Sequence, residues 1–157
     1  MISEFEFFHG AALARVLHGT KRSVTIAPFT DSDNAAYLIN GRTGLYVKYS
    51  SKRLSPWRFS FHGRHCEVIA SMGAELGNAV VALVCNDDGI AALGLDEFQQ
   101  VASCGRDQVQ WVSAARGRRQ MYLIKGSDGE LAFKVGMNEL LAKLRSGDGV
   151  DPGTAGA

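Results

Sequence analysis

The chain has 157 residues, 46% of them hydrophobic, and a formal net charge of +1 at pH 7. This length and composition are typical of one globular domain with a hydrophobic core and exclude a largely disordered chain. No apolar run approaches the roughly 18 residues of a membrane-spanning helix, and the acidic start lacks the features of a signal peptide, so we expect a cytoplasmic protein of prokaryotic type.

The first half of the chain predicts one helix followed by several strands. Hydrophobic spacing predicts the helix over Phe5–Leu17 and a strand over Ser23–Phe29. Residues 35–39 and 45–49 flank turn residues and predict a hairpin. Trp57–Phe61 alternates aromatic and polar residues, which indicates a strand with one solvent-facing side.

From His65 the hydrophobic period becomes that of a helix, and Gly77 stands where a left-handed C-cap would end it. The run Ala79–Cys85 is apolar throughout, as in a central strand buried on both faces. After a turn, Ile90–Leu93 predicts a short partner strand, and Asp96 can cap a short helix.

The last third predicts a second hairpin, over Gln110–Ala115 and Gln120–Lys125, and a final helix capped by Asn138. Residues 146–157 have little to bury and are expected to form a flexible tail. The sequence therefore predicts a single α+β domain over residues 1–145, with a mixed central sheet, flanking helices and a C-terminal hairpin and helix.

The three cysteines, Cys66, Cys85 and Cys104, are odd in number and lack the short spacing of a CxxC metal or redox site. In a reducing cytoplasm such cysteines are expected to be unpaired thiols, either buried or incidental.

Positive charge is concentrated in two acid-free stretches. No Asp or Glu lies between Asp33 and Glu67, and a second basic turn, at residues 116–119, lies in the acid-free stretch between Asp107 and Asp128. If the two turns lie on one side of the domain, they form one basic cleft that suits the phosphate backbone of DNA or RNA. The predicted phosphate-binding residues are Lys48, Lys52, Arg53, Arg58, Arg64, Arg118 and Arg119.

The aromatic residues of the first acid-free stretch have two interpretations. Trp57, Phe59 and Phe61 are expected mainly in the core. Tyr46 shares one face of its strand with Lys48, and on a solvent-exposed face the two side chains would form an aromatic–cation pair able to approach a base and a phosphate.

The predicted order of helix, three strands, helix and apolar strand, over about residues 1–85, resembles the core of the PD-(D/E)XK, or restriction-endonuclease-like, superfamily. The resemblance implies an aspartate at the start of the second core strand and a (D/E)-x-K motif on the third. Asp33 and Lys48 match the aspartate and the lysine, but Tyr46 stands where the motif has an acid. Some members carry the missing carboxylate on the following helix, where Glu67 stands here.

The resemblance thus implies a degenerate or migrated metal site. Asp33 and Glu67 would bind Mg²⁺ or Mn²⁺, and Lys48 would assist the water that attacks the phosphodiester, as in a metal-dependent nuclease. The simpler interpretation is that Asp33 starts a turn and that Lys48 is an ordinary outward-facing strand residue.

Other motifs give less support for chemistry. His62–Cys66 contains two histidines and a thiol, but no second ligand cluster follows at zinc-binding spacing. No phosphate-cradling glycine-rich loop and no serine-hydrolase motif is present. The sequence therefore favours a nucleic-acid-associated domain with a nuclease-like fold. The alternative is a non-catalytic protein-interaction or regulatory module whose acidic protein partner binds the same basic face.

Overall fold

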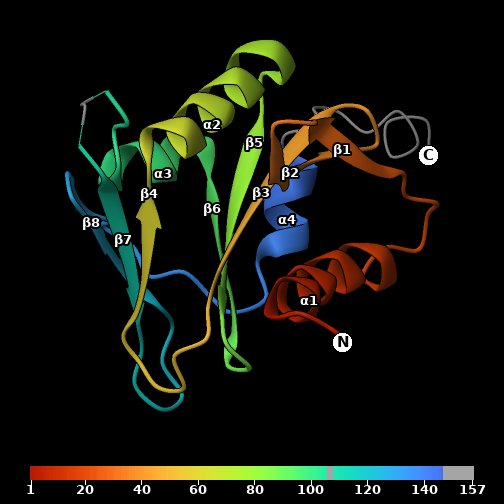
Figure 1. The fold of residues 1–157 in the computed structure, drawn as a ribbon. Helices are drawn as coiled ribbons and strands as arrows, with labels where there is room; N and C mark the ends of the chain where they lie inside the picture. The colour runs from red at the N-terminus through yellow and green to blue at the C-terminus, as the bar shows by residue number, and fades with distance from the viewer. Residues whose placement is uncertain (106–107, 147–157) are drawn as a thin grey trace.

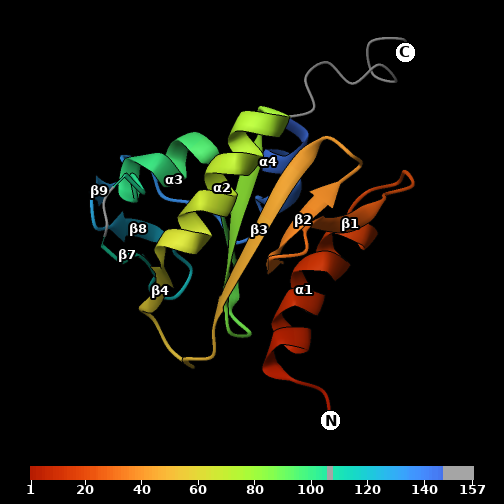
Figure 2. The same cartoon turned by 45° about the horizontal axis from the view of Figure 1, so that its top comes forward.

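Two β-sheets and the helices around them make up the fold, described by the computed structural model for residues 1–105 and 108–146 (Figures 1 and 2). The main sheet consists of β1 Ile26–Thr30, β2 Asp33–Ile39, β3 Thr43–Ser50, β5 Ala79–Cys85 and β6 Gly89–Gly94. The second sheet consists of β4 Trp57–Phe61, β7 Gln110–Ala115, β8 Leu123–Gly126 and β9 Gly129–Glu130. The helices are α1 Glu4–His18, α2 Gly63–Leu76, α3 Leu95–Val101 and α4 Leu140–Ser146.

The main sheet is mixed, with the strand order β1-β2-β3-β5-β6 among the described residues. Its first three strands are antiparallel neighbours, β5 runs parallel to β3, and β6 returns antiparallel to β5. A parallel pair needs a crossover connection, and the segment containing β4 and α2 provides it. The predicted α+β class with a mixed central sheet is confirmed.

The second sheet is formed by residues far apart in the sequence. β4 leaves the main sheet after β3 and pairs with β7, and β7 pairs in turn with β8. The alternating burial predicted for β4 is confirmed, because Trp57, Phe59 and Phe61 are buried and the two residues between them are exposed. Trp57, Phe59 and Phe61 belong to the core, as expected.

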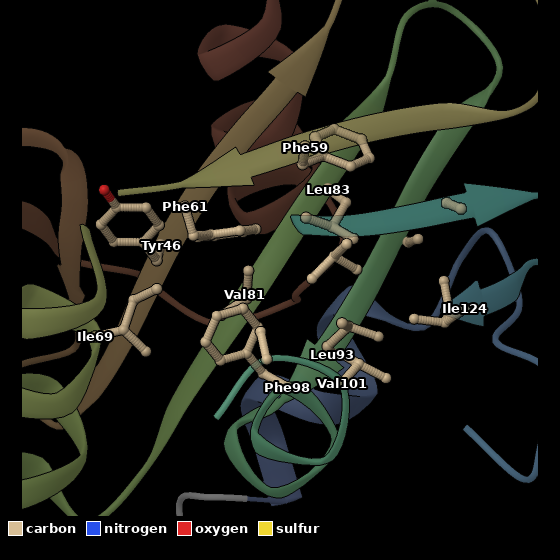
Figure 3. Close-up of a cluster of buried hydrophobic side chains, with 14 of the residues drawn as sticks. Tyr46, Phe59, Phe61, Ile69, Val81, Leu83, Leu93, Phe98, Val101 and Ile124 are labelled. Carbon is tan, nitrogen blue, oxygen red and sulfur yellow. The ribbon is translucent and has the colours of Figure 1, made fainter. Parts of the chain in front are cut away.

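The core has two layers because the main sheet is buried on both faces. On one face Leu45 and Val80 pack with residues of α1 and α4. On the other face Tyr46 and Val81 pack with α2, α3 and the inner side of the second sheet (Figure 3). Every residue of β5 is buried, which confirms the prediction for its apolar run.

Several predicted boundaries need small corrections. β1 begins at Ile26, three residues later than predicted, and α3 is capped by Gly94, whose N–H donates to the Glu97 carboxylate, rather than by Asp96. Gly77 does end α2 in the left-handed region, with φ of 74°. The predicted tail lies outside the described residues except for Ser146. Within the described ranges, no helix has both the length and the apolarity needed to cross a membrane.

Candidate functional site

A cleft of about 610 Å³ lies where the turn between β1 and β2 faces the first turns of α2. It brings together Asp33, from the start of β2, and Glu67, from α2, which are 34 positions apart in the sequence. The sequence-predicted pair of acidic residues is therefore placed in one cleft. The ionisable residues that line the cleft are Asp31, Asp33, His62, Arg64, His65 and Glu67.

Asp33 is held by two hydrogen bonds. The Tyr46 hydroxyl donates to its Oδ2 at 2.6 Å, and the Ala35 backbone N–H donates to its Oδ1 at 2.9 Å. Burial, followed by the bond to Asp33, raises the pKa of Tyr46 far above its usual value. Tyr46 is thus a neutral, fully buried donor, and the prediction that it forms an exposed aromatic–cation pair is wrong. Its ring packs within the core instead.

Lys48 lies on the same side of β3 as Tyr46 and is partly buried. Burial lowers its pKa, and the nearby Asp33 carboxylate opposes that shift. Its Nζ lies 5.4 Å from the centroid of the Phe61 ring. In the part of the chain that the structure describes, no hydrogen bond or ion pair engages this ammonium group. The electrostatic effect of Asp33 on Lys48 shows that the two side chains lie near each other.

Two histidines complete the cleft. The His62 backbone N–H donates to His65 Nδ1 at 3.1 Å, so the neutral His65 ring carries its proton on Nε2. Burial, and then the positive charge of Lys48, lower the pKa of His65. The two imidazole centroids are 5.3 Å apart. The sequence pattern indicated only a possible zinc site for these two histidines. Their position at the start of a predicted helix that also carries Glu67 could have indicated that they lie in the same cleft as that residue.

The cleft differs from the usual metal site of the superfamily it resembles, because Tyr46 stands at the acid position of the motif. Both oxygens of Asp33 already accept hydrogen bonds, and Tyr46 presents a protonated phenol where a second carboxylate is needed. Among the described residues, no group of three or more His, Cys, Asp or Glu side chains could hold a metal ion. The roles of Asp33 and Glu67 as metal ligands stay predictions.

The two predicted basic turns lie side by side. The Arg116 backbone N–H donates to Ser55 Oγ at 3.0 Å, which joins the loop between β3 and β4 to the loop between β7 and β8. Both loops reach the same end of the molecule in Figure 1. We call these loops, residues 51–56 and 116–122, the basic loops. Their exposed cationic side chains are Lys52, Arg53, Arg118 and Arg119.

The first basic loop is held by its own hydrogen bonds. The Trp57 indole N–H donates to the Lys52 carbonyl at 2.8 Å, and Lys52 Nζ donates to the Pro56 carbonyl at 2.8 Å. Arg53, which lies between them, is exposed to solvent. The loop therefore holds its shape independently of a ligand while presenting Arg53 outward.

The remaining predicted phosphate-binding residues are placed elsewhere. Arg58 projects from the outer side of β4, with its guanidinium carbon 4.5 Å from the centroid of the Trp111 ring. Arg64 is on α2, and its Nη2 donates to the Ser32 carbonyl at 3.2 Å across the cleft. The seven predicted residues thus divide among the basic loops, the second sheet, the cleft and, for Lys48, strand β3 of the main sheet.

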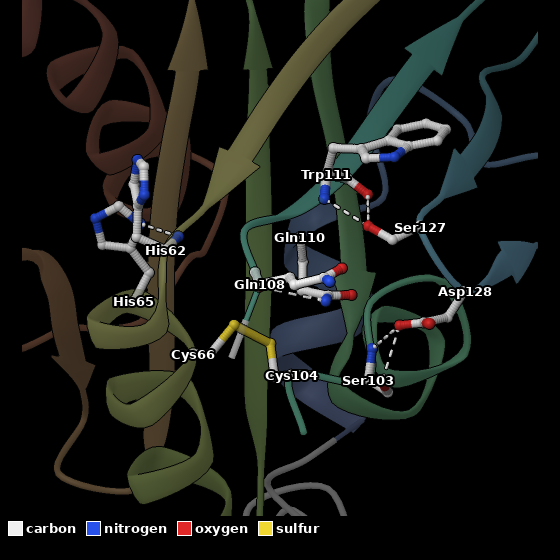
Figure 4. The surroundings of a disulfide bond; sticks show 10 residues. All are labelled: His62, His65, Cys66, Ser103, Cys104, Gln108, Gln110, Trp111, Ser127 and Asp128. Carbon is white, nitrogen blue, oxygen red and sulfur yellow. Dashed lines mark hydrogen bonds between the residues drawn. A yellow bond between two sulfur atoms is a disulfide. The ribbon is translucent and has the colours of Figure 1, made fainter. Parts of the chain in front are cut away.

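Cys66 and Cys104 form a disulfide, with Cα atoms 5.4 Å apart (Figure 4). The prediction of three unpaired thiols is therefore wrong for these two residues, and only Cys85 is a buried free cysteine among the described residues. A separation of 38 residues hid the pair, since spacing alone does not show which cysteines meet in space. The bond ties α2, beside the cleft, to the segment after α3.

No protein family, curated protein or solved structure matches this chain. Its function is therefore inferred from the chemistry of the cleft and of the basic loops.

Proposed function

We propose that this domain binds the phosphate backbone of nucleic acid through the basic loops. The observation that carries the proposal is the hydrogen bond from the Arg116 N–H to Ser55 Oγ, because it puts the two acid-free segments on one surface. Lys and Arg side chains that neutralise phosphates release counterions, which gives affinity without sequence readout.

The nearest acids leave this surface positive. Asp88, in the turn between β5 and β6, is already paired with Arg116, so its charge is balanced within the protein. Asp87 is exposed beside it. Four exposed cations on the basic loops therefore outweigh one exposed acid in that turn.

We also propose that the fold is related to the nuclease-like core of the PD-(D/E)XK superfamily, with a degenerate metal site. Three antiparallel strands, a helix and a strand parallel to the third follow the order implied by the resemblance to the PD-(D/E)XK superfamily. Asp33, Lys48 and Glu67 are the residues that would take part in cleavage, but Tyr46 occupies the place of the second carboxylate. We propose backbone binding as the function and assign no catalytic step.

Binding can be tested by fluorescence anisotropy with labelled duplex and single-stranded oligonucleotides over a range of salt concentrations. About four phosphate contacts predict that log K for duplex falls with log salt at a slope of roughly −3 to −4. The variant Arg53→Glu/Arg118→Glu should weaken binding at least tenfold and reduce the slope by about 2.

A matched control is Lys21→Glu/Arg42→Glu, which makes the same change in net charge. Arg42 precedes β3 and the first basic loop follows it, so the eight residues of that strand separate them by about 25 Å. This control should bind nearly as well as the unaltered protein at physiological salt, where charges this far apart are screened. Equal losses in the two double variants would contradict a localised basic surface.

Cleavage is tested in the same samples by adding Mn²⁺ and separating the products on a gel. Any cleavage should disappear with Asp33→Ala while binding persists. Cleavage that survives this substitution would exclude Asp33 from the activity. If no oligonucleotide binds even at low salt, the nucleic-acid proposal is wrong. Binding of an acidic protein partner then becomes the function to test.

A further inference from the structure

The second sheet has one buried side and one solvent-facing side. The alternation along β4 and β7 sends Phe59 and Val112 inward, toward α3 and the main sheet. The intervening residues project outward and remain at least partly exposed. We call this side the outer face; its polar and aromatic residues include Arg58, Ser60, Trp111, Ser113, Lys125 and Glu130.

Trp111 is the aromatic residue of the outer face. Unlike Trp57, which is only 2% exposed, it is partly open to solvent. The Trp111 backbone N–H donates to Ser127 Oγ at 2.7 Å (Figure 4), and the Ser127 backbone N–H donates to the Trp111 carbonyl at 3.0 Å. The backbone that carries the indole is thus fixed on both sides of the residue.

The cations of the outer face lie next to this ring. The Arg58 guanidinium covers the indole at 4.5 Å, a geometry in which a cation is attracted to the electron-rich ring face. In the strand register Arg58 pairs with Ser113, and Ser113 pairs with Lys125. A row of Arg58, Ser113, Lys125 and Glu130 therefore crosses the sheet on this face, with its acid at the β9 edge.

The outer face is continuous with the basic loops. β4 begins at Trp57, directly after the first loop, and β7 ends at Ala115, directly before the second. Trp111 is five positions from Arg116, a distance of roughly 17 Å along a strand. The acid of the outer face, Glu130, lies opposite Lys125 at the β9 edge of the sheet. A chain of phosphates would therefore cross the sheet over β4 and β7, away from that edge.

We propose that the outer face binds single-stranded nucleic acid, with a base stacked on Trp111. The base takes the place of the Arg58 guanidinium on the indole, and Arg58 then contacts the adjacent phosphate. This inference rests on the proposed function, since the bound nucleic acid would continue from the outer face onto the basic loops. A single strand suits the surface because its bases are free to leave their neighbours, whereas the bases of a duplex are stacked inside it.

The ring and the cation have separable signatures in binding experiments. Trp111→Ala should weaken binding to a single-stranded 12-mer by roughly 5- to 150-fold and leave duplex binding within about twofold. Trp111→Phe should retain most of the affinity because a phenyl ring still stacks. Arg58→Ala should reduce the single-strand salt slope by about 0.7, the contribution of one phosphate. Neither Trp111 variant should change this slope.

Phe7→Ala is the control for loss of an exposed aromatic residue, since Phe7 is 62% exposed on α1, away from the second sheet. DNA and RNA 12-mers of the same sequence are titrated in parallel to identify which sugar is preferred. Tryptophan fluorescence gives a second readout, because the chain has only two tryptophans and Trp57 is buried. A stacked base should quench the signal of the unaltered protein but not that of Trp111→Ala.

The outcomes separate the two proposals. If Arg53→Glu/Arg118→Glu reduces binding but Trp111→Ala does not, and no quenching occurs, the stacking inference is wrong and the proposed function stands. If Trp111→Ala weakens duplex and single strand equally, the single-strand assignment is wrong. If no oligonucleotide binds the unaltered protein, both proposals fail.

Discussion

The protein contains two aspartate–tyrosine pairs of the same geometry with different surroundings. At the start of β2, Asp33 Oδ2 accepts a hydrogen bond from the Tyr46 hydroxyl at 2.6 Å. At the turn after β5, Asp88 Oδ2 accepts one from the Tyr122 hydroxyl, also at 2.6 Å. In both pairs the phenol is fully buried, and its pKa is raised mainly by burial and by the carboxylate.

The two pairs differ in whether a cationic side chain is bonded to the carboxylate. Arg116 completes the second pair, with its Nε and Nη2 donating to the two Asp88 oxygens at 2.7 and 2.6 Å. The first pair has Lys48 and Arg64 near it, but within residues 1–105 and 108–146 neither cation forms a hydrogen bond or ion pair with Asp33, which lines the cleft. A completed arginine–carboxylate pair stabilises the structure. The first pair lacks such an arginine partner, and its carboxylate lines the cleft instead.

The completed pair also supports the proposed binding surface. Arg116 belongs to the second basic loop, so its bond to Asp88 anchors that loop to the turn of the main sheet while Ser55 joins it to the first loop. The Asp88–Arg116 pair is therefore expected to hold the second basic loop in place, and both aspartate–tyrosine pairs are expected to contribute to stability. The following predictions compare the two regions.

Reducing the Cys66–Cys104 disulfide should have the largest effect, because it anchors the helix that lines the Asp33 cleft. A cross-link between residues 38 positions apart is expected to contribute about 3–4 kcal/mol by restricting the unfolded chain. Urea unfolding with and without reductant measures this difference. The variant Cys66→Ala/Cys104→Ala should unfold as the reduced protein does and should not respond to reductant.

Asp88→Asn should destabilise the protein by about 2–3 kcal/mol, because it leaves Arg116 and Tyr122 without their charged acceptor. Arg116 holds the pKa of Asp88 below its ordinary value, so this stabilisation is present above about pH 4 and is lost as the pH falls through the lowered pKa. Urea unfolding between pH 3 and 7 should show that loss in the unaltered protein but not in Asp88→Asn. A variant as stable as the unaltered protein at pH 7 would contradict the anchoring role.

Tyr46→Phe and Tyr122→Phe compare the two pairs directly. Removing the Tyr46 hydroxyl takes away the donor to Asp33 Oδ2 and should cost about 2 kcal/mol. Removing the Tyr122 hydroxyl should cost only about 1 kcal/mol, because Arg116 Nε still donates to Asp88 Oδ2. Thermal and urea unfolding of both variants test the order. The reverse order would mean that Arg116 does not compensate for the lost phenol.

His9, whose pKa is influenced by Asp33, should make a smaller, pH-dependent contribution to the free energy of unfolding. It lies on the buried side of α1, with Nδ1 2.8 Å from the Tyr37 hydroxyl. Burial lowers its pKa from 6.5 to about 4, and Asp33 opposes the shift. The folded state therefore holds neutral His9. Its contribution is complete above pH 6.5 and declines toward pH 4, as the unfolded state binds the proton first.

After allowing for partial screening by solvent, we expect the free energy of unfolding to fall by about 1 to 2 kcal/mol because of His9 as the pH falls from 6.5 to 4. Proton NMR of the His9 ring would follow its titration, and urea unfolding of His9→Gln at several pH values would isolate its share. A ring that titrates near pH 6.5 in the folded protein would rule out this contribution.

Elements whose side-chain periodicity is local could be predicted from the amino-acid sequence. The apolar run of β5, the alternation of β4 and the amphipathic spacing of α2 each follow from how side chains repeat along a strand or a helix. They predicted the α+β class and the buried positions of Trp57, Phe59 and Phe61. The acid-free stretches likewise predicted which segments carry the positive surface.

The contacts between distant segments, in contrast, became visible in the folded chain. Pairing of β4 with β7, the Cys66–Cys104 bond and the contact between Ser55 and Arg116 join residues separated by dozens of positions. No local periodicity encodes such pairings, because they depend on how the two sheets pack. The same packing buried Tyr46 against α2 and turned Trp111 outward, so the roles of these two aromatic residues depended on the assembled fold.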